Sequence, residues 1–384
     1  MVKALLITSD FPPGFSGGIS RYYYSFAREL ADQIVVMSPQ CSASSTFDIA
    51  QPFPIIRLQV PVGRALLLRF TQTMLLGLQA ILWSSRIGAD LILWGHWYLV
   101  LAAIIVHVTT HLPFGVFLHG GELNRFRRQP VLQRVIVSLI NYAALIVVNS
   151  DYTRQEYVGI GVSNKIIHKV SPGVDTNRFR PGINCSTVLE KYDLDGRKVL
   201  LTISRLVERK GHDQVIKALP KILEKVPQTI YLIVGTGPQE SHLRSLAYEI
   251  GVAAQVLFAG FVPEEELSAY YNACDVFVMP SRQTEGREGI EGFGIVYLEA
   301  NACGKPAIGG NSGGVSDAVI DGITGLLVDP LSKQAVADAV IRLLLDGNLA
   351  RQMGKQGREI VERDCTWNIQ SRKLHHLLQG SMSR

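Results

Sequence analysis

The chain has 384 residues, which is too long for one typical hydrophobic core and therefore favours two domains. Hydrophobic residues make up 47% and charged residues 18% of the sequence, a balance typical of globular proteins that argues against a disordered or fibrous chain. The formal net charge of +5 suits an anionic substrate or an anionic membrane surface, but no dense Lys/Arg run with interleaved aromatic residues points to nucleic acid as a partner.

The first half of the chain alternates short apolar strands with helices. A strand is predicted over residues 3–8, followed by a helix over residues 17–32 that opens with glycines. Further strands are predicted over residues 33–38, 90–95, 113–120 and 143–150. Each ends in small or polar residues, as expected where a parallel sheet presents the loops at its carboxyl ends to a ligand.

Two apolar stretches in this half, residues 65–83 and 97–108, raise the question of a membrane span. The first contains polar residues that make a poor spanning helix, namely Arg69, Thr71, Gln72 and Gln79. The second is too short to cross a hydrocarbon layer of about 30 Å. We therefore predict that both stretches are helices buried within the protein.

A second series of strands and helices begins near residue 197. Its strands are predicted over residues 198–204, 229–235, 255–260, 276–281 and 305–310, and its helices over 211–226 and 264–273. Two such series predict two doubly wound α/β domains, at residues 1–175 and 176–365, joined by the Pro- and Gly-containing segment 171–181. The last segment, 366–384, lies outside the second series and is predicted to pack back on the first domain.

Gly17 and Gly18 follow the first strand and a Pro-Pro loop, and they open the first helix. Such a turn lets backbone N–H groups approach an anion at the helix N-terminus, where the helix dipole adds about 0.3–1 kcal/mol. The spacing is not that of a dinucleotide-binding GxGxxG turn. The alternative interpretation is a glycine turn that binds no ligand.

Arg205 and Lys210 follow a predicted strand of the second domain. Two cations at the carboxyl end of a strand suit a diphosphate, because Arg grips two oxygens and Lys supplies a point charge. Taken alone, such a pair is more often ordinary surface charge, and the neighbouring Glu208 and Arg209 are interpreted as solvated. Gly235 ends the next strand in a turn that we expect to line the same cleft.

Glu291 lies in a glycine-rich loop, and Glu299 follows eight residues later in a predicted helix. A loop carboxylate can accept hydrogen bonds from hydroxyl groups, and the backbone amides of Phe293, Gly294 and Ile295 would lie at a helix N-terminus that suits a phosphate. Glu299 would then accept hydrogen bonds from a ribose diol. The alternative is a capping acid and a helix-surface acid that bind nothing.

These motifs, in this order, resemble those of the family-four retaining glycosyltransferases. The resemblance covers almost the whole chain and includes "DFPPGFSGGISRY", "HGGE", "SPGVD", "SRLVERKGH", "FAGFVPEEEL" and "EGFGIVYLEANACGKPAIGGNSGG". The last of these is especially similar to the phosphatidylinositol-mannoside mannosyltransferase branch. The resemblance implies the GT-B fold, in which two facing Rossmann-like domains hold a nucleotide-sugar in the cleft between them.

The resemblance also implies roles for these residues. Arg205 and Lys210 would bind the donor diphosphate and stabilise the leaving phosphate, while Glu291 would hold sugar hydroxyls. His119, at the end of a strand, would touch the donor sugar near its 6-hydroxyl. The remaining implied donor contacts are Gly17, Gly18, Gly235, Val262 at the nucleobase, Phe293, Gly294, Ile295, and Glu299 at the ribose.

The implied reaction retains the configuration at the anomeric carbon. The sequence offers no obvious covalent nucleophile, so the resemblance implies attack on the front face with the departing phosphate as the base. No Asp-x-Asp metal motif is evident among the candidate site residues, and Arg205 and Lys210 would take over the role of a cation. We therefore predict no bound metal and no cofactor besides the donor itself.

The segment 124–140 places Arg125, Arg127, Arg128 and Arg134 beside apolar residues. A basic amphipathic helix of this kind suits anionic lipid headgroups, so we predict a cytoplasmic protein that associates peripherally with the inner face of the cell membrane. The alternative is an ordinary helix that packs its apolar side on the domain.

The sequence thus predicts transfer of a hexose, mannose from GDP-mannose, to a lipid-linked sugar or a growing glycan. A second interpretation is a UDP-sugar transferase with a soluble acceptor. A third is a protein that binds a sugar nucleotide without catalysis, although the intact Arg205, Lys210, Glu291 and Glu299 argue against it.

Overall fold

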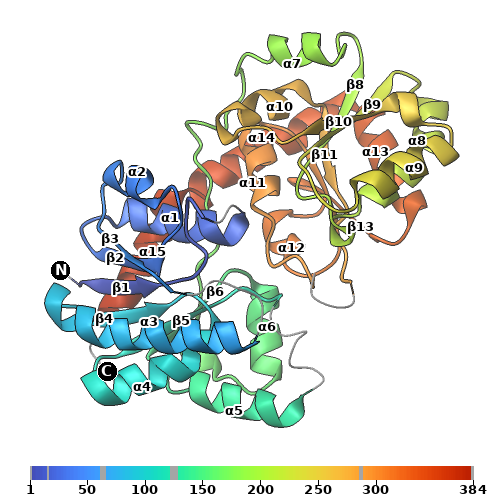
Figure 1. Ribbon diagram of the computed structural model, residues 1–384. Helices are drawn as coiled ribbons and strands as arrows, with labels where there is room; N and C mark the ends of the chain where they lie inside the picture. The colour runs from blue at the N-terminus through green and yellow to red at the C-terminus, as the bar shows by residue number, and fades with distance from the viewer. Residues whose placement is uncertain (1, 15–16, 61–65, 122–128, 285–288, 382–384) are drawn as a thin grey trace. The chain divides into compact units, whose positions relative to one another are not determined.

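The computed structural model describes residues 2–14, 17–60, 66–121, 129–284 and 289–381. The chain divides into two compact units, drawn in Figure 1. The first unit comprises Met1–Pro172 and Trp367–Arg384, and the second comprises Gly173–Thr366. Each unit is built on one parallel sheet, so the predicted two-fold α/β architecture is confirmed.

The first unit contains a seven-stranded parallel sheet in the order β3-β2-β1-β4-β5-β6-β7. Its strands are β1 (Ala4–Ile7), β2 (Ile34–Pro39), β3 (Ile55–Leu58), β4 (Leu91–Trp94), β5 (Phe114–Leu118), β6 (Leu145–Val148) and β7 (Ile167–Lys169). The strand order reverses between β1 and β4, and in open α/β sheets ligands bind at the carboxyl ends of the strands beside such a switch point. The loops that follow β1, β4 and β5 are therefore where a site is expected.

Helices cover both faces of this sheet. They are α1 (Gly18–Glu29), α2 (Ser44–Ile49), α3 (Leu66–Ile87), α4 (Val100–Thr110), α5 (Pro130–Ile140), α6 (Asp151–Gly159) and α15 (Trp367–Gly380). Helices α3, α4 and α5 bury side chains in a core shared with one face of the sheet. On the other face α15 packs against α1, where the Trp367 ring lies 5.6 Å from the Phe26 ring and 6.3 Å from the Tyr22 ring.

The prediction that the two long apolar stretches are buried is only partly correct. Helix α3 buries Leu76 and Ala80 but exposes Leu78 and Leu82. Helix α4 exposes a stripe of its own, described below. Among the helices of the described residues, none combines the length and the apolar character that a membrane span requires.

The second unit contains a six-stranded parallel sheet in the order β10-β9-β8-β11-β12-β13. Its strands are β8 (Lys198–Ile203), β9 (Thr229–Val234), β10 (Val256–Gly260), β11 (Val276–Met279), β12 (Ala307–Gly310) and β13 (Gly325–Val328). Its helices are α7 (Ser186–Lys191), α8 (His212–Lys225), α9 (Glu240–Glu249), α10 (Leu267–Ala273), α11 (Ile295–Ala302), α12 (Val315–Ala318), α13 (Lys333–Leu345) and α14 (Gly347–Asp364).

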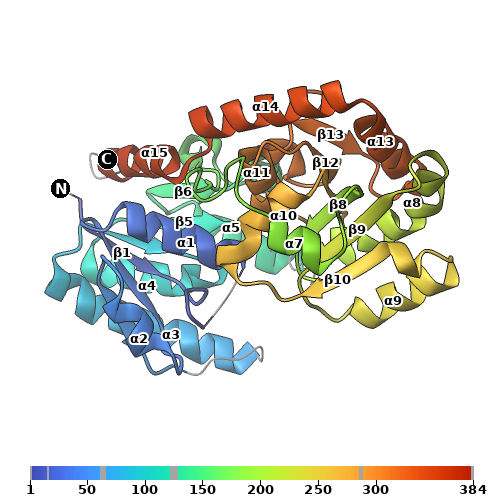
Figure 2. The same ribbon diagram turned by 90° about the horizontal axis from the view of Figure 1, so that it is seen from above.

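Both faces of this second sheet are buried, as is typical of parallel sheets. Successive strand residues such as Leu200 and Leu201 point into different cores because side chains alternate across a strand. One core is closed by α10 and α11, and the other by α8, α9 and α13. Figure 2 shows these helices on either side of the strands. The order again reverses between β8 and β11, so the loops after these two strands mark the expected site.

Candidate active site

A cluster of opposite charges lies at the carboxyl end of β8 in the second unit. Lys210 belongs to a short 3-10 helix, η4 (Glu208–Lys210), and its Nζ lies 2.5 Å from Oε2 of Glu291. The same oxygen accepts a hydrogen bond of 2.6 Å from Nη1 of Arg209. The prediction that Arg209 is a solvated neighbour is therefore wrong, because its guanidinium pairs with the loop carboxylate.

Burial and charge act in opposite directions on this cluster. Burial alone would raise the pKa of Glu291, but Lys210 and Arg209 outweigh it and lower that pKa to about 2. Burial lowers the pKa of Lys210, and the Glu291 carboxylate opposes this effect. Glu291 therefore keeps a buried lysine charged, and one carboxylate holds two cations in place.

A glycine fixes the backbone behind these cations. Gly211 ends η4 and begins α8 with a φ of +74°, a conformation that other residues rarely adopt. A Cβ at this position would lie 2.2 Å from the carbonyl oxygen of Pro280, which follows β11. The loops after the two switch-point strands thus touch backbone to backbone, and this contact sets where Lys210 points.

Arg205 differs from Lys210, because its side chain is exposed. Among the described residues, no hydrogen bond or ion pair of its guanidinium is found, although its charge acts on Lys210. Gly235, predicted to line the cleft, packs against this loop: a Cβ there would lie 2.0 Å from the carbonyl oxygen of Ser204. Gly235 therefore shapes the turn that carries Arg205.

Residues 293–295 begin helix α11 as predicted. Gly294 is the N-cap with a φ of +93°, and a Cβ there would meet the Tyr297 ring at 2.5 Å. The side chains of Phe293 and Ile295 are buried in the core. Any contact of these two residues with a ligand must therefore come from the backbone.

Glu299 and Val262 are both buried. Glu299 is 1% exposed, and its Oε2 accepts a 2.7 Å hydrogen bond from the hydroxyl of Tyr271 on α10. It is therefore not the helix-surface acid of the alternative interpretation. Val262 follows β10 and joins the core, whereas its neighbour Phe261 is exposed. A nucleobase contact at Val262 would again use the backbone.

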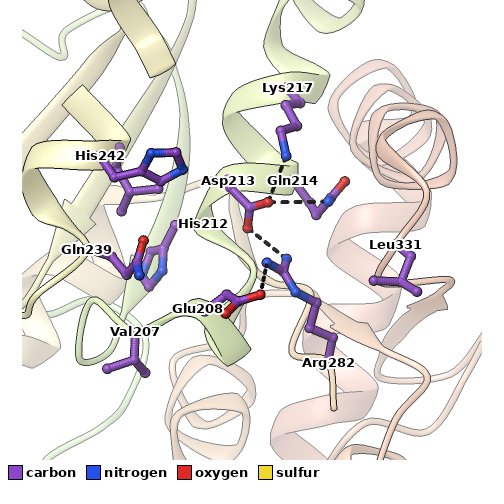
Figure 3. A pocket seen from close by; sticks show the side chains of 11 residues that line it. Val207, Glu208, His212, Asp213, Gln214, Lys217, Gln239, His242, Arg282 and Leu331 are labelled. Carbon is purple, nitrogen blue, oxygen red and sulfur yellow. Dashed lines mark hydrogen bonds and ion pairs between the residues drawn. The ribbon is translucent and has the colours of Figure 1, made fainter. Parts of the chain in front are cut away.

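Figure 3 shows a second charged network, which contacts η4 through Glu208. Arg282 is buried and donates a 2.7 Å hydrogen bond from Nη1 to Oδ1 of Asp213 on α8, and its Nη2 lies 3.5 Å from Glu208. Its backbone N–H donates to the carbonyl oxygen of Arg209. Asp213 also accepts a hydrogen bond from Lys217. Arg282 thus connects Glu208 and Arg209 of η4 to α8, and nothing in the sequence patterns pointed to it.

These residues line a surface pocket of about 640 Å³. Burial alone would raise the pKa of Asp213, but the hydrogen bonds from Arg282 and Lys217 lower it. The charges around the pocket are thus paired with each other, so we interpret the network as a clamp on η4 and not as a separate ligand site.

The first unit brings other predicted residues to the carboxyl end of its sheet. Gly17 is the N-cap of α1 with a φ of +143°, and Gly18 begins that helix. His119 follows β5 and is buried, with Nε2 lying 2.6 Å from the Tyr23 hydroxyl. The Tyr23 hydroxyl also donates to the carbonyl oxygen of Gly95, so Tyr23 connects the loops that follow β4 and β5.

Burial lowers the pKa of His119 to about 3, and the neighbouring His96 contributes to this shift. His119 is therefore neutral at physiological pH. Sequence reasoning missed His96 and Asp10, whose side chains approach to 3.4 Å beside His119. A signal was available, because each lies in the loop that follows a switch-point strand, β4 or β1, yet lone residues of these types are usually structural.

Part of the predicted membrane segment lies outside the described residues, namely Arg125, Arg127 and Arg128. Arg134 lies on α5 and is exposed. No group of three or more His, Cys, Asp or Glu side chains that could hold a metal ion occurs in the described part of the chain.

Two family models match the chain. Residues 16–178 match the model described as glycosyltransferase family 4, and residues 188–360 match that of glycosyl transferases group 1. A GDP-mannose-dependent α-(1-6)-phosphatidylinositol monomannoside mannosyltransferase from Mycobacterium tuberculosis H37Rv is 35% identical over 99% of both chains. A homologous enzyme from Mycolicibacterium smegmatis is 34% identical over 98% of both.

The chain belongs to glycosyltransferase family 4. A further relative, from Corynebacterium glutamicum, is 31% identical over 98% of both chains and is described as a GDP-mannose-dependent monoacylated α-(1-6)-phosphatidylinositol monomannoside mannosyltransferase. As a family 4 member the chain is a hexosyltransferase of the retaining class, so the predicted enzyme class is confirmed.

Solved glycosyltransferase structures share its fold. Anabaena HepE in complex with UDP and glucose superimposes with a TM-score of 0.83 at 21% identity, covering 99% of this chain and 100% of that one. Sucrose-phosphate synthase from Thermosynechococcus elongatus gives 0.82 at 24% identity, with both chains fully covered. The predicted GT-B fold is therefore confirmed.

Proposed function

We propose that this family 4 enzyme transfers a mannosyl residue from GDP-mannose to a phosphatidylinositol mannoside at a membrane surface. The observation that carries the proposal is the Lys210–Glu291–Arg209 cluster beside the exposed Arg205 at the switch point of the second unit. The relatives that match over the full chain support the choice of donor and acceptor, because each is described as using GDP-mannose and a phosphatidylinositol mannoside.

The donor diphosphate would bind to Arg205 and Lys210. Arg205 is exposed and its fork can grip two phosphate oxygens, while the buried Lys210 supplies a fixed positive charge. Because Glu291 holds Lys210 in place before the donor arrives, little reorganisation is needed when negative charge develops on the leaving phosphate. Water excluded from the site strengthens this interaction further.

The transfer then needs no covalent intermediate. The acceptor oxygen forms its bond to the anomeric carbon on the face from which the diphosphate departs, and the bond from that carbon to the phosphate oxygen breaks. The proton of the acceptor hydroxyl passes to the departing phosphate oxygen. The configuration at the anomeric carbon is thereby retained.

His119 acts in this proposal as a neutral hydrogen-bonding group. Its Nε2 hydrogen bonds with the Tyr23 hydroxyl, and the neutral ring would form a hydrogen bond with a hydroxyl group of the donor sugar. A ring with a pKa of about 3 stays neutral at the pH of the cytoplasm, so it positions the sugar without adding charge near the anomeric carbon. Gly17, Gly18, Gly235 and the backbone of residues 293–295 would contribute close contacts with the donor, and Glu299 would contact the ribose.

The donor is tested by thermal stabilisation with GDP, UDP and ADP, since a ligand that binds the folded state raises its apparent stability. The proposal expects GDP to give the largest shift. A larger shift with UDP would instead favour the UDP-sugar transferase. HepE, whose structure contains UDP, shares the fold of this chain but is only 21% identical to it.

Catalysis is tested with GDP-mannose and a phosphatidylinositol mannoside dispersed in detergent. Lys210→Ala should lower the rate by about 10²–10³-fold, the usual effect of losing one group that stabilises a developing negative charge. Turnover in excess chelator should be unchanged, because Arg205 and Lys210 replace a metal ion. Donor binding without any transfer by the wild type would identify a non-catalytic binding protein.

A further inference from the structure

Helix α3 exposes large apolar residues that a helix facing water would normally bury. Its buried side includes the polar residues Gln72, Thr73 and Ser84. Its exposed side carries large apolar residues, namely Leu68, Phe70, Leu78 and Leu82, whose side chains are 40–58% exposed. Surface helices of globular proteins normally show the opposite pattern, so the outer side of α3 is suited to contact something other than water.

Helix α4 continues this apolar surface. Leu101, Ile105 and Val108 are spaced four and three residues apart, so they form one stripe, and each is exposed. The two helices pack closely, because a Cβ at Gly77 of α3 would lie 3.2 Å from Cβ of Ala102 on α4. Figure 1 shows α3 and α4 side by side, so the exposed residues that neighbour this contact in sequence belong to adjoining stripes.

Helix α5 packs against α4 and extends the surface. It exposes Val131, Leu132 and Val135, with Val131 being 73% exposed. We call the exposed apolar side chains of α3, α4 and α5 the apolar face. Its extent exceeds the scattered single residues that are ordinary on a protein surface.

The charge on these three helices has one sign. Their sequences contain Arg69, Arg86 and Arg134 but no Asp or Glu. Helix α14 in the second unit shows the contrast, since Lys355 and Glu359 form an ion pair on its exposed side. A surface of large apolar side chains with only positive charge is complementary to an anionic lipid bilayer, in which headgroups are negative and the acyl region is apolar.

We propose that the apolar face is the surface by which this protein docks on an anionic bilayer. The docking surface is thus larger than the segment 124–140 and centres on α3 and α4. Leu78, Leu82, Leu101 and Ile105 would enter the boundary between headgroups and acyl chains, and the exposed Arg86 and Arg134 would contact lipid phosphates.

Docking through α3 would bring the bilayer close to the proposed acceptor side of the active site. Near its first turn Arg69 lies over the Tyr98 ring, with 5.7 Å between the guanidinium carbon and the ring centroid. The Tyr98 hydroxyl in turn hydrogen bonds with Ser9, the neighbour of Asp10 at the carboxyl end of the sheet. A bilayer that covers α3 therefore lies next to the edge where His119 and Asp10 meet. This step rests on the proposed function, because only a lipid acceptor would need that proximity.

The test is sedimentation of the full chain with vesicles of phosphatidylcholine alone or mixed with phosphatidylglycerol. The wild type should bind the mixed vesicles more tightly, and less so at high salt. The double variant Leu78→Glu/Ile105→Glu should lose at least about tenfold in affinity, since it places negative charge on the side that enters the bilayer. Arg134→Ala should lose about fivefold, the usual contribution of one basic residue near an anionic surface.

The matched control is Ile49→Glu, which changes an apolar residue on α2 that is 88% exposed but lies outside the apolar face. It should bind vesicles like the wild type. All changed side chains are exposed, so thermal melts followed by circular dichroism should be the same for each variant. Equal vesicle binding by the double variant and the wild type would overturn the proposal, as would a wild type that binds no vesicles.

A second copy of the chain is the competing occupant. If light scattering shows a wild-type dimer and a monomeric double variant, and neither binds vesicles, the apolar face is a subunit interface and the proposal is wrong. Failure of the proposed function has a different signature: the wild type would bind vesicles but transfer no mannose to a detergent-dispersed acceptor. The double variant should transfer mannose to that acceptor at the wild-type rate, because its catalytic groups are unchanged.

Discussion

Replacing Glu291 with glutamine tests whether one carboxylate organises the donor site. The pKa of Glu291 is lowered from 4.5 to about 2, a difference of about 2.5 units. At 1.36 kcal/mol per unit this corresponds to about 3 kcal/mol of stabilisation at neutral pH. The same size is expected from the general cost of leaving a buried charge such as Lys210 without its partner, roughly 3–5 kcal/mol.

The tryptophans let this loss be assigned to one unit. All four, Trp83, Trp94, Trp97 and Trp367, belong to the first unit, so tryptophan fluorescence reports on that unit alone, whereas far-ultraviolet circular dichroism reports on both. Glu291→Gln should lower the urea midpoint seen by circular dichroism by roughly 1–3 M, given a slope of about 1–3 kcal/mol per molar urea. The fluorescence midpoint should move less.

The pH dependence has a definite sign. The pKa of Glu291 is lowered in the folded state, so the stabilisation is fully present above the unfolded value of 4.5 and is lost as the pH falls towards 2. The difference between wild type and Glu291→Gln should therefore shrink to about half near pH 3. Glu208→Gln is the control, because its side chain is 61% exposed and should change the midpoint little. Identical midpoints of Glu291→Gln and the wild type at pH 7 would refute the reasoning.

Three further predictions concern single residues. Gly211→Ala should destabilise the second unit by more than about 2 kcal/mol in urea unfolding, whereas Gly251→Ala, with a similar φ of +76° but no atom near the new Cβ, should cost only about 1 kcal/mol. Arg282→Met should lower kcat/KM by up to about 100-fold through a misplaced Lys210, with Arg282→Lys restoring only part, and equal kcat/KM would disprove the clamp. The ring nitrogen signals of His119 should not titrate between about pH 5 and 8, and a midpoint in that range would contradict its buried neutral state.

The sequence predicts the strands of both sheets wherever an apolar run ends in small or polar residues. It does not reveal β3, β7 or β13, because these strands are only three or four residues long and lie at the edges of their sheets. The prediction that residues 65–83 form a buried helix is also wrong for one side of α3, which is exposed. Apolar content predicts burial only when the surroundings are water, and the sequence alone does not say what the outer side of a helix faces.

The candidate site shows a similar division. The spacing between Glu291 and Glu299 and the resemblance to a family pointed to residues that the chain brings to the ends of its strands. The partners of those residues were not visible, because Arg209, Arg282 and Asp10 are common surface types whose burial depends on contacts distant in sequence. A carboxylate at 291 pairs with a guanidinium at 209 only because Gly211 lets the loops after β8 and β11 touch.

The two units differ in the charge of the groups at the carboxyl ends of their sheets. The second unit holds two buried or half-buried cations on one carboxylate, and this arrangement suits a group on which negative charge grows during the reaction. The first unit holds two neutral histidines beside a carboxyl group whose pKa is raised by burial, so it presents hydrogen-bonding groups with little charge. A cation near the anomeric carbon would repel the positive charge that develops there during the reaction. A neutral His119 avoids that repulsion. The low pKa of His119 is therefore as much a part of the proposed chemistry as the charge on Lys210.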